Sequence, residues 1–114
     1  AAEGAEPAAR AMNAAARAGR LRVVRWLHDN STAGCTAKAM DWAAMNNHIQ
    51  VVEFLHSSRD EGGTYRGGYA AAYRGHLQMV EWLVNNRPDE IGPDILDRAA
   101  EGGSTGCVRW LWRR

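Results

Sequence analysis

The chain has 114 residues, the size of one domain that can fold alone. Its 14 Lys and Arg residues nearly balance its 13 Asp and Glu residues, giving a formal net charge of +1, and this balance disfavours nucleic acid as a partner because neutralising a phosphate backbone requires an excess of cations. No apolar stretch is long enough to span a membrane, and residues 1–7 lack the basic start and apolar middle of a signal peptide.

One pattern recurs every 28 residues along the chain, without a gap. Its most regular parts begin at positions 19, 47, 75 and 103. A pair of alanines precedes each part at constant spacing: Ala15-Ala16, Ala43-Ala44, Ala71-Ala72 and Ala99-Ala100. A period of this length predicts a solenoid of small stacked modules. We therefore expect one all-α domain over residues 1–114, an α-solenoid of four stacked helix-turn-helix repeats at about 8–35, 36–63, 64–91 and 92–114.

The first repeat starts after Pro7, which suits the beginning of a helix, and continues in an Ala-rich stretch of strong helix propensity. Its helix should end at Gly19, because glycine readily takes the left-handed conformation that closes a helix. The equivalent positions in the other repeats are Asn47, Gly75 and Gly103, and Asn is the usual substitute for glycine there. Each repeat is thus predicted to have a tight turn between two helices.

The first helix of a repeat is clearest in the second repeat. Thr36 can cap a helix over residues 37–46. Within it, Met40, Ala43 and Ala44 recur at the spacing of one buried stripe. The small alanine side chains should let a neighbouring helix approach closely.

The second helix of the same repeat is expected over residues 48–57. Its polar residues Gln50 and Glu53 face water, and its apolar residues face inward. The inward set is Ile49, Val52, Phe54 and Leu55. At the position of Phe54, the four repeats carry a column of aromatic residues, namely Trp26, Phe54, Trp82 and Trp110. We interpret this column as packing residues, because large aromatics are far more often core than ligand-binding.

The third repeat carries glycines inside its predicted first helix. Gly67 and Gly68 stand where the second repeat has Ala39 and Met40, and each costs about 1 kcal/mol relative to Ala in a helix. We therefore expect this helix to start late. The glycines on both sides of Thr64 do not indicate a phosphate-binding loop, since no Gly-Lys-Ser or Gly-Lys-Thr follows them and no strand precedes them.

The fourth repeat departs from the pattern. The repeat opens with Gly92-Pro93-Asp94, and its second helix contains Ser104, Thr105 and Gly106 before the sequence stops at Arg114. Two interpretations remain open, a degenerate capping repeat and a segment of a longer array.

The repeat resembles a known family in its most regular copy. Ala71-Ala72, two variable residues, Gly75-His76-Leu77 and the alternating polar and apolar residues up to Leu83 resemble the ankyrin repeat, and the resemblance covers all four repeats over about residues 8–111. The unit is shorter than the usual length of about 33 residues, and the missing residues are those of the projecting β-hairpin. Lys38-Ala39-Met40-Asp41 stands where the family has Thr-Pro-Leu-His. The chain is similar to a short, Trp-rich ankyrin variant with reduced hairpin loops.

The resemblance implies a binding mode as well as a fold. Ankyrin repeats bind partners on the concave face, through the exposed side of the first helix of each hairpin. The resemblance also implies that His48 and His76, which follow the turn residue, hydrogen-bond to backbone between repeats. Binding through projecting hairpin fingers is not expected, because this chain lacks them.

Helical spacing independently puts a mixed set of side chains on the side of the first helices opposite the alanine stripe. These positions do not keep one residue type, since Trp42 aligns with Ala70 and Arg98, and such variation is typical of a surface. Exposed Trp, Tyr, Met and Arg together have the composition of an interface. The predicted partner-binding residues are Lys38, Trp42, Met45, Asn46, Tyr65, Tyr73 and Arg74. In the alternative interpretation, which stands equally, Trp42 packs on a neighbouring helix or on Tyr65 or Tyr69.

No catalytic residue, metal ligand or cofactor site is predicted. His28 and His56 align at the end of the second helices, and no set of His, Cys and carboxylates has the close spacing of a zinc site. The sequence has no nucleophile elbow, no Cys with a partner His and no identifiable carboxylate pair. Cys35 and Cys107 lie at non-equivalent places in the repeat, which favours reduced thiols and a cytoplasmic or nuclear location.

The leading hypothesis is therefore a protein-binding module, a scaffold or adaptor and not an enzyme, that binds another protein on its concave helix face. The alternative is a structural spacer or accessory subunit of a larger assembly without a dedicated ligand site. A third hypothesis, nucleic-acid binding through Lys38, Arg66 and Arg74, is disfavoured by the charge balance. No membrane partner is expected.

Overall fold

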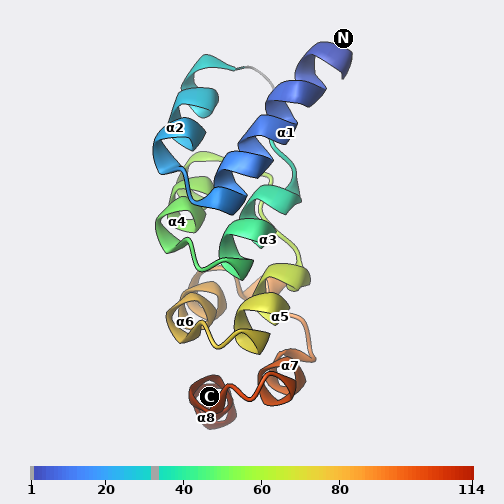
Figure 1. Cartoon of the computed structure of the whole chain (residues 1–114). Helices are drawn as coiled ribbons and strands as arrows, with labels where there is room; N and C mark the ends of the chain where they lie inside the picture. The colour runs from blue at the N-terminus through green and yellow to red at the C-terminus, as the bar shows by residue number, and fades with distance from the viewer. Residues whose placement is uncertain (1, 32–33) are drawn as a thin grey trace.

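The computed structural model describes residues 2–31 and 34–114 and contains only helices in this part of the chain. Four helical hairpins follow one another in chain order and form an elongated stack of 46 × 23 × 20 Å (Figure 1). The first two hairpins consist of α1 (Ala2–Ala18) with α2 (Leu21–Asn30) and α3 (Ala37–Met45) with α4 (Ile49–Ser58). The last two consist of α5 (Tyr65–Tyr73) with α6 (Leu77–Asn86) and α7 (Ile95–Glu101) with α8 (Thr105–Arg113), and a 3₁₀ turn, η1 (Pro88–Glu90), joins α6 to α7. The all-α solenoid predicted from the period is confirmed. In the first connection between repeats, residues 32 and 33 lie outside the described residues.

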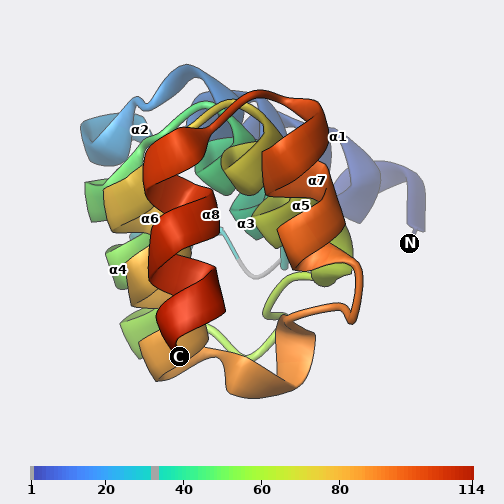
Figure 2. The ribbon, with the colours of Figure 1, turned by 90° about the horizontal axis from the view of Figure 1, so that it is seen from below.

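The helices form two layers, with α1, α3, α5 and α7 in one and α2, α4, α6 and α8 in the other (Figure 2). Neighbouring first helices contact each other much more extensively than neighbouring second helices do. The alanine pairs explain this closeness, since Ala16, Ala44 and Ala72 are fully buried or nearly so between first helices. The first helices therefore form the more closely packed of the two layers.

The turns between the two helices of each hairpin lie where the sequence places them. The backbone φ is positive at Gly19, Asn47, Gly75 and Gly103, with a value of 63° at Asn47. In the second hairpin, the N–H of Asn47 donates to the carbonyl of Ala44 at 3.1 Å, which closes the helix end. The left-handed turn residues are therefore confirmed at all four positions.

Neighbouring repeats are joined by polar contacts at the start of each first helix. The hydroxyl of Thr36 accepts from the N–H of Lys38 at 3.2 Å and from the amide of Asn13 in the preceding repeat at 3.0 Å. Thr64 repeats this role in α5, donating from its N–H to Asp41 at 2.7 Å and from its hydroxyl at 2.6 Å. A helix cap and a junction between repeats are thus made by the same residue.

The aromatic column contains one wrong prediction. Phe54, Trp82 and Trp110 pack against the core, but Trp26 is 62% exposed. The reason is the missing neighbour: the ring of Trp82 contacts His56 of the preceding repeat with ring centroids 5.1 Å apart, and Phe54 contacts His28 in the same way at 5.4 Å. No described helix precedes α2 on that side, so Trp26 is left in solvent.

Two predicted helix starts are also wrong. α1 begins at Ala2, and Pro7 lies inside it, not at its start. α5 begins at Tyr65 and includes both glycines, so it does not start late. A Cβ on Gly67 would lie 3.1 Å from the backbone of Asp41, a contact closer than side chains usually make. The glycine costs helix propensity but allows α3 and α5 to approach each other.

Candidate functional site

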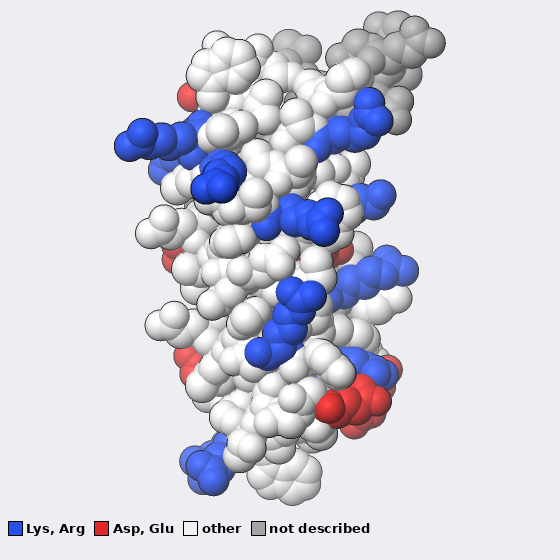
Figure 3. Space-filling view, in the orientation of Figure 1, with Lys and Arg blue, Asp and Glu red and all other residues white. Residues whose placement is uncertain are grey.

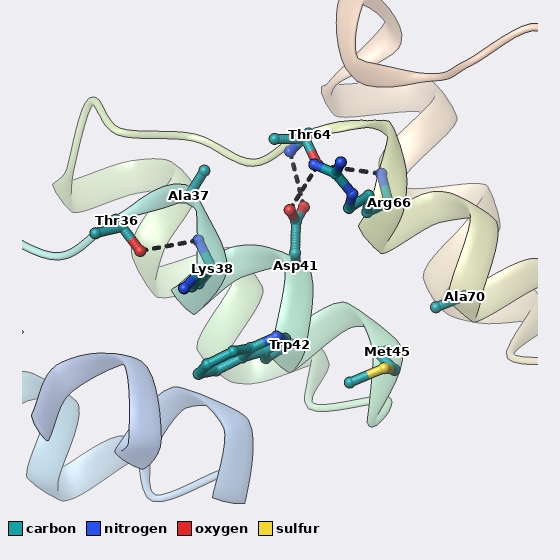
Figure 4. A pocket seen from close by; sticks show the side chains of 9 residues that line it. All are labelled: Thr36, Ala37, Lys38, Asp41, Trp42, Met45, Thr64, Arg66 and Ala70. Carbon is teal, nitrogen blue, oxygen red and sulfur yellow. Dashed lines mark hydrogen bonds between the residues drawn. The ribbon is translucent and has the colours of Figure 1, made fainter. Parts of the chain in front are cut away.

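A groove of about 600 Å³ lies between α3 and α5, on the side of the first helices that faces away from the second helices (Figure 4). Three of the predicted binding residues line it, namely Lys38, Trp42 and Met45. The other lining residues are Thr36, Ala37, Asp41, Thr64, Arg66 and Ala70. We call this feature the α3–α5 groove.

Trp42 is the largest side chain in the groove. It is half-buried, and cations lie on its ring: the guanidinium carbon of Arg17 is 5.4 Å from the ring centroid and Nζ of Lys38 is 5.7 Å from it. Tyr65 and Tyr69, the alternative ring partners considered for Trp42, instead pack on each other with centroids 5.1 Å apart. The indole is thus held by basic residues at the edge of a cavity.

A second, shallower hollow of about 380 Å³ continues toward α7. It shares Met45, Arg66 and Ala70 with the α3–α5 groove. The predicted residues Tyr73 and Arg74 line this hollow, and Tyr73 is 53% exposed. The two hollows bring five of the seven predicted residues onto one continuous surface, which we call the first-helix face.

The other two predicted residues line neither hollow. Asn46 ends α3, and its amide donates to the carbonyls of Trp42 at 2.9 Å and Arg17 at 3.4 Å. Its amide oxygen accepts from Arg74 at 3.1 Å. Tyr65 stands at the start of α5 and is 46% exposed beside Arg66. The contacts of Asn46 hold repeats together.

Asp41 is the one carboxylate among the residues that line the α3–α5 groove. Both of its oxygens accept hydrogen bonds from Thr64, and Figure 4 shows the carboxylate turned toward that residue and away from Trp42. Burial raises the pKa of Asp41 above its ordinary value of 3.8, while the hydrogen bonds from Thr64 act in the opposite direction. Asp41 is therefore a structural acceptor between repeats.

Basic side chains dominate the surface seen in the orientation of Figure 1 (Figure 3). Several of them follow one another down the centre and the side on which the first helices lie, others lie over the two ends of the second-helix layer, and acidic side chains appear toward the margins. Arg98 of α7, in the second hollow, is paired with Glu101. The first-helix face thus combines apolar hollows with cations.

Histidines make further polar contacts between repeats. Arg59 bridges the second and first repeats, hydrogen-bonding to His28 Nδ1 at 2.8 Å and pairing with Glu61 at 2.8 Å. Arg87 makes the equivalent contact with His56 at 3.1 Å. His76 donates from Nε2 to the carbonyl of Met45 at 3.1 Å, the backbone contact that the resemblance implied. These histidines are therefore structural.

Sequence reasoning missed the residues that frame the groove at the starts of α3 and α5. Thr36 was predicted only as a helix cap and Thr64 was noted only as a residue between two glycine pairs, although their 28-residue spacing signals a shared place in the stack. Helical spacing placed Ala70 on the same side as Tyr73 and Arg74, but Ala70 was not among the predicted binding residues. Its small size is what leaves room opposite Trp42.

The model of a protein family, described as ankyrin repeats (many copies), matches residues 11–56 and 69–111. This chain belongs to the ankyrin-repeat family. Ankyrin repeats are generally protein–protein interaction modules. No curated protein matches this ankyrin chain.

Three further observations concern other kinds of site in this ankyrin chain. No helix of the described part is both long and apolar enough to cross a bilayer. Within residues 2–31 and 34–114, no three His, Cys, Asp or Glu side chains are grouped so that they could hold a metal ion. Cys35 and Cys107 are unbonded thiols, and burial raises the pKa of both.

Proposed function

We propose that this ankyrin chain is a protein-binding module, without enzymatic activity, whose partner lies on the first-helix face. The observation that carries the proposal is the α3–α5 groove, in which Trp42 and Met45 form an apolar surface next to exposed Lys38. A half-buried Trp at the edge of a concave, apolar site is typical of the residues that contribute most to protein association. The family supplies the general role, since its members generally bind proteins.

The predicted binding residues have different roles in this proposal. Trp42 and Met45 would contact the partner in the groove, and Tyr73 and Arg74 would contact it in the adjacent hollow. Lys38 and Tyr65 would lie at the edges of the interface. Asn46 would act indirectly, by holding the end of α3 against the neighbouring repeats.

The test is quantitative capture of interacting proteins from cell extracts by wild-type chain and single variants. Trp42→Ala and Tyr73→Ala should each weaken capture of the same proteins by more than about 1 kcal/mol, that is, more than about fivefold. Gln50→Ala and Gln78→Ala are matched controls, because both residues are exposed on the second helices of the same central repeats. Loss of capture by the controls, with the first-helix variants unaffected, would place the site on the other layer.

Folding must be measured on the same variants, because Trp42 is half-buried. Unfolding in urea should show little change for Trp42→Ala and Tyr73→Ala. A large loss of stability in Trp42→Ala, without weaker capture, would support the interpretation in which Trp42 serves only packing.

A second candidate function is a structural spacer or accessory subunit. It is favoured by apolar side chains that remain uncovered at both ends of the stack, where Val23 is 47% exposed, Trp26 62% and Trp112 77%. Such surfaces in an assembly would contact neighbouring subunits end to end. If this function is correct, Trp26→Ser and Trp112→Ser will abolish assembly while Trp42→Ala leaves it intact.

We also propose a cytoplasmic or nuclear location. The support is the pair of unbonded thiols, Cys35 and Cys107, which are compatible with a reducing compartment. Microscopy of the tagged chain would test this location.

A further inference from the structure

The cations next to the α3–α5 groove have no acidic partner within the described residues. The three ion pairs found there are Arg59–Glu61, Arg87–Glu90 and Arg98–Glu101. Lys38 and Arg66, which line the groove, take part in none of them and are exposed. They stand one 28-residue period apart, on neighbouring first helices, so the groove has a cation on each helix.

The carboxylate in the groove does not neutralise these cations by direct contact. Asp41 accepts from the N–H and the hydroxyl of Thr64, it is turned toward that residue and away from Trp42, and it takes part in none of the three ion pairs. Arg17 adds another exposed cation on the ring of Trp42. A bound group would therefore meet the indole and the thioether of Met45 at the floor and positive charge at the rim.

We propose that the partner segment is an acidic peptide that inserts one apolar side chain between Trp42 and Met45 and places carboxylates beside Lys38 and Arg66. The proposal rests on the proposed function, protein binding at the first-helix face, and specifies the chemistry of the partner. Carboxylates would complete ion pairs that the chain itself leaves unmade, and complementary charge contributes mainly to specificity and association rate.

The spacing of the two helices sets the spacing of the acidic residues. Closely packed helices lie about 8–10 Å apart, and about three residues of extended chain cover that distance at roughly 3.3 Å each. The expected segment thus has acidic residues three positions apart with an apolar residue between them. Side chains three positions apart in an extended chain point to opposite sides, so one carboxylate would face Lys38 on α3 and the other Arg66 on α5. Peptide is favoured over nucleic acid because the chain carries a net charge of only +1 and the floor is formed by aliphatic as well as aromatic groups.

The test uses the whole chain, labelled with ¹⁵N, and synthetic peptides in a low-salt buffer. The probe contains Asp-Leu-Gly-Asp between Gly-Ser segments, and its controls contain Asn-Leu-Gly-Asn, Asp-Gly-Gly-Asp and Lys-Leu-Gly-Lys. A single-stranded oligothymidine is the nucleic-acid control. Binding is read from the indole N–H signal of Trp42 and the amide signal of Ala70, which report on the groove itself.

We expect the Asp-Leu-Gly-Asp peptide to bind at least about fivefold more tightly than each peptide control, as expected for two exposed charge pairs and one apolar contact. The double variant Lys38→Glu with Arg66→Glu should lose this preference and favour the Lys-Leu-Gly-Lys peptide. The control variant is Arg22→Glu with Arg109→Glu, at exposed positions of the second helices. It changes the net charge by the same amount and should retain the preference for the Asp-Leu-Gly-Asp peptide. The fold should survive the groove variant because only the backbone N–H groups of Lys38 and Arg66 take part in capping.

Three outcomes would overturn the proposal in different ways. Equal binding of the Asp and Asn peptides would overturn the acidic partner but keep a protein-binding groove. Tighter binding of oligothymidine at the Trp42 signal would assign the face to nucleic acid. If none of the peptides moves the groove signals, the peptide proposal is wrong, whereas the proposed function is decided separately by the capture experiment with Trp42→Ala.

Discussion

Leu55 in α4 and Leu111 in α8 occupy the same position of the repeat, yet Leu55 is 2% exposed and Leu111 is only partly buried. Ala44 and Ala100 differ in the same way, since the first is 1% exposed and the second is exposed to solvent. The residue types are identical, so the difference comes from the next repeat, since α5 and α6 cover the second hairpin and no described helix follows α8. Burial in this fold is supplied by the neighbour and not by the hairpin itself.

The same contrast applies to the polar junctions. Asp41 binds the start of α5, whereas Asp97, at the equivalent position of α7, is exposed. Gly19 lies against the ring of His48 in the next repeat, whereas a Cβ added to Gly103 would meet nothing within 4 Å. Matched substitutions at interior and end positions can therefore measure what a neighbouring repeat contributes.

The largest difference is expected between Leu55→Ala and Leu111→Ala. Truncating the buried Leu55 should cost about 2–5 kcal/mol of unfolding free energy, since it removes apolar contacts and leaves a cavity. Truncating Leu111 should cost less than about 1.5 kcal/mol, because its side chain is already partly hydrated. Urea unfolding followed by circular dichroism gives both values. Equal losses would show that α8 is covered in solution, for example by self-association.

The next difference is expected between Asp41→Ala and Asp97→Ala. Removing Asp41 leaves the N–H and hydroxyl of Thr64 without their acceptor, which should cost about 1.5–3 kcal/mol for hydrogen bonds to a charged group. The Asp97 variant should lie within about 0.5 kcal/mol of wild type, as for other exposed sites. Hydrogen exchange at the start of α5 should accelerate only in the first variant. Slow exchange there in Asp41→Ala would contradict the assigned junction.

A smaller difference is expected between Gly19→Ala and Gly103→Ala. Both should lose roughly 1–2 kcal/mol, because an L-residue is strained at positive φ, and thermal unfolding can compare them. Gly19→Ala should lose more, since its new Cβ would lie 2.5 Å from the His48 ring and force it to move. Asn47→Gly serves as the control and should be near neutral. A more damaging Gly103→Ala would mean that something covers this turn.

The smallest expected effect is the pH dependence of stability that comes from Asp41 at the junction between α3 and α5. Burial raises the pKa of Asp41, so the folded state holds its proton more tightly than the unfolded state does. The stability that this contributes is full below pH 3.8 and is lost as pH rises through the folded-state pKa. The stability of wild type relative to Asp41→Asn should therefore fall between pH 3.8 and neutral pH. Parallel stability curves for the two proteins would show that the carboxyl pKa is not raised.

The sequence predicted the repeated features of the fold well, because each is encoded locally. Asn47 and the turn glycines mark helix ends through their backbone preference, and Thr36 marks a helix start through its side-chain oxygen. The predicted late start of α5 was wrong because packing against α3 outweighs the low helix propensity of Gly67. Local rules describe a hairpin in isolation and omit what its neighbour requires.

The candidate site shows the same limit. Helical spacing alone placed Lys38, Trp42 and Met45 on one side of α3, and the structure brings them together in the groove. The opposite wall, formed by Thr64 and Ala70, depends on the offset between α3 and α5, which no periodicity within one helix contains. For the same reason the aromatic column did not show that Trp26 lacks a covering neighbour.

The recurrence of one junction chemistry has a consequence for how such a chain can change its length. If residues 36–63 were lost in one step, Asn13 would come to face Thr64. Its amide could then accept from the N–H and donate to the hydroxyl of Thr64, as it now does with Thr36. Loss of a single residue inside a helix would instead rotate all later side chains by about 100° and destroy the match. Duplications and deletions in the gene are therefore tolerated in whole repeat units, and the length of the stack can evolve separately from the chemistry of its surface.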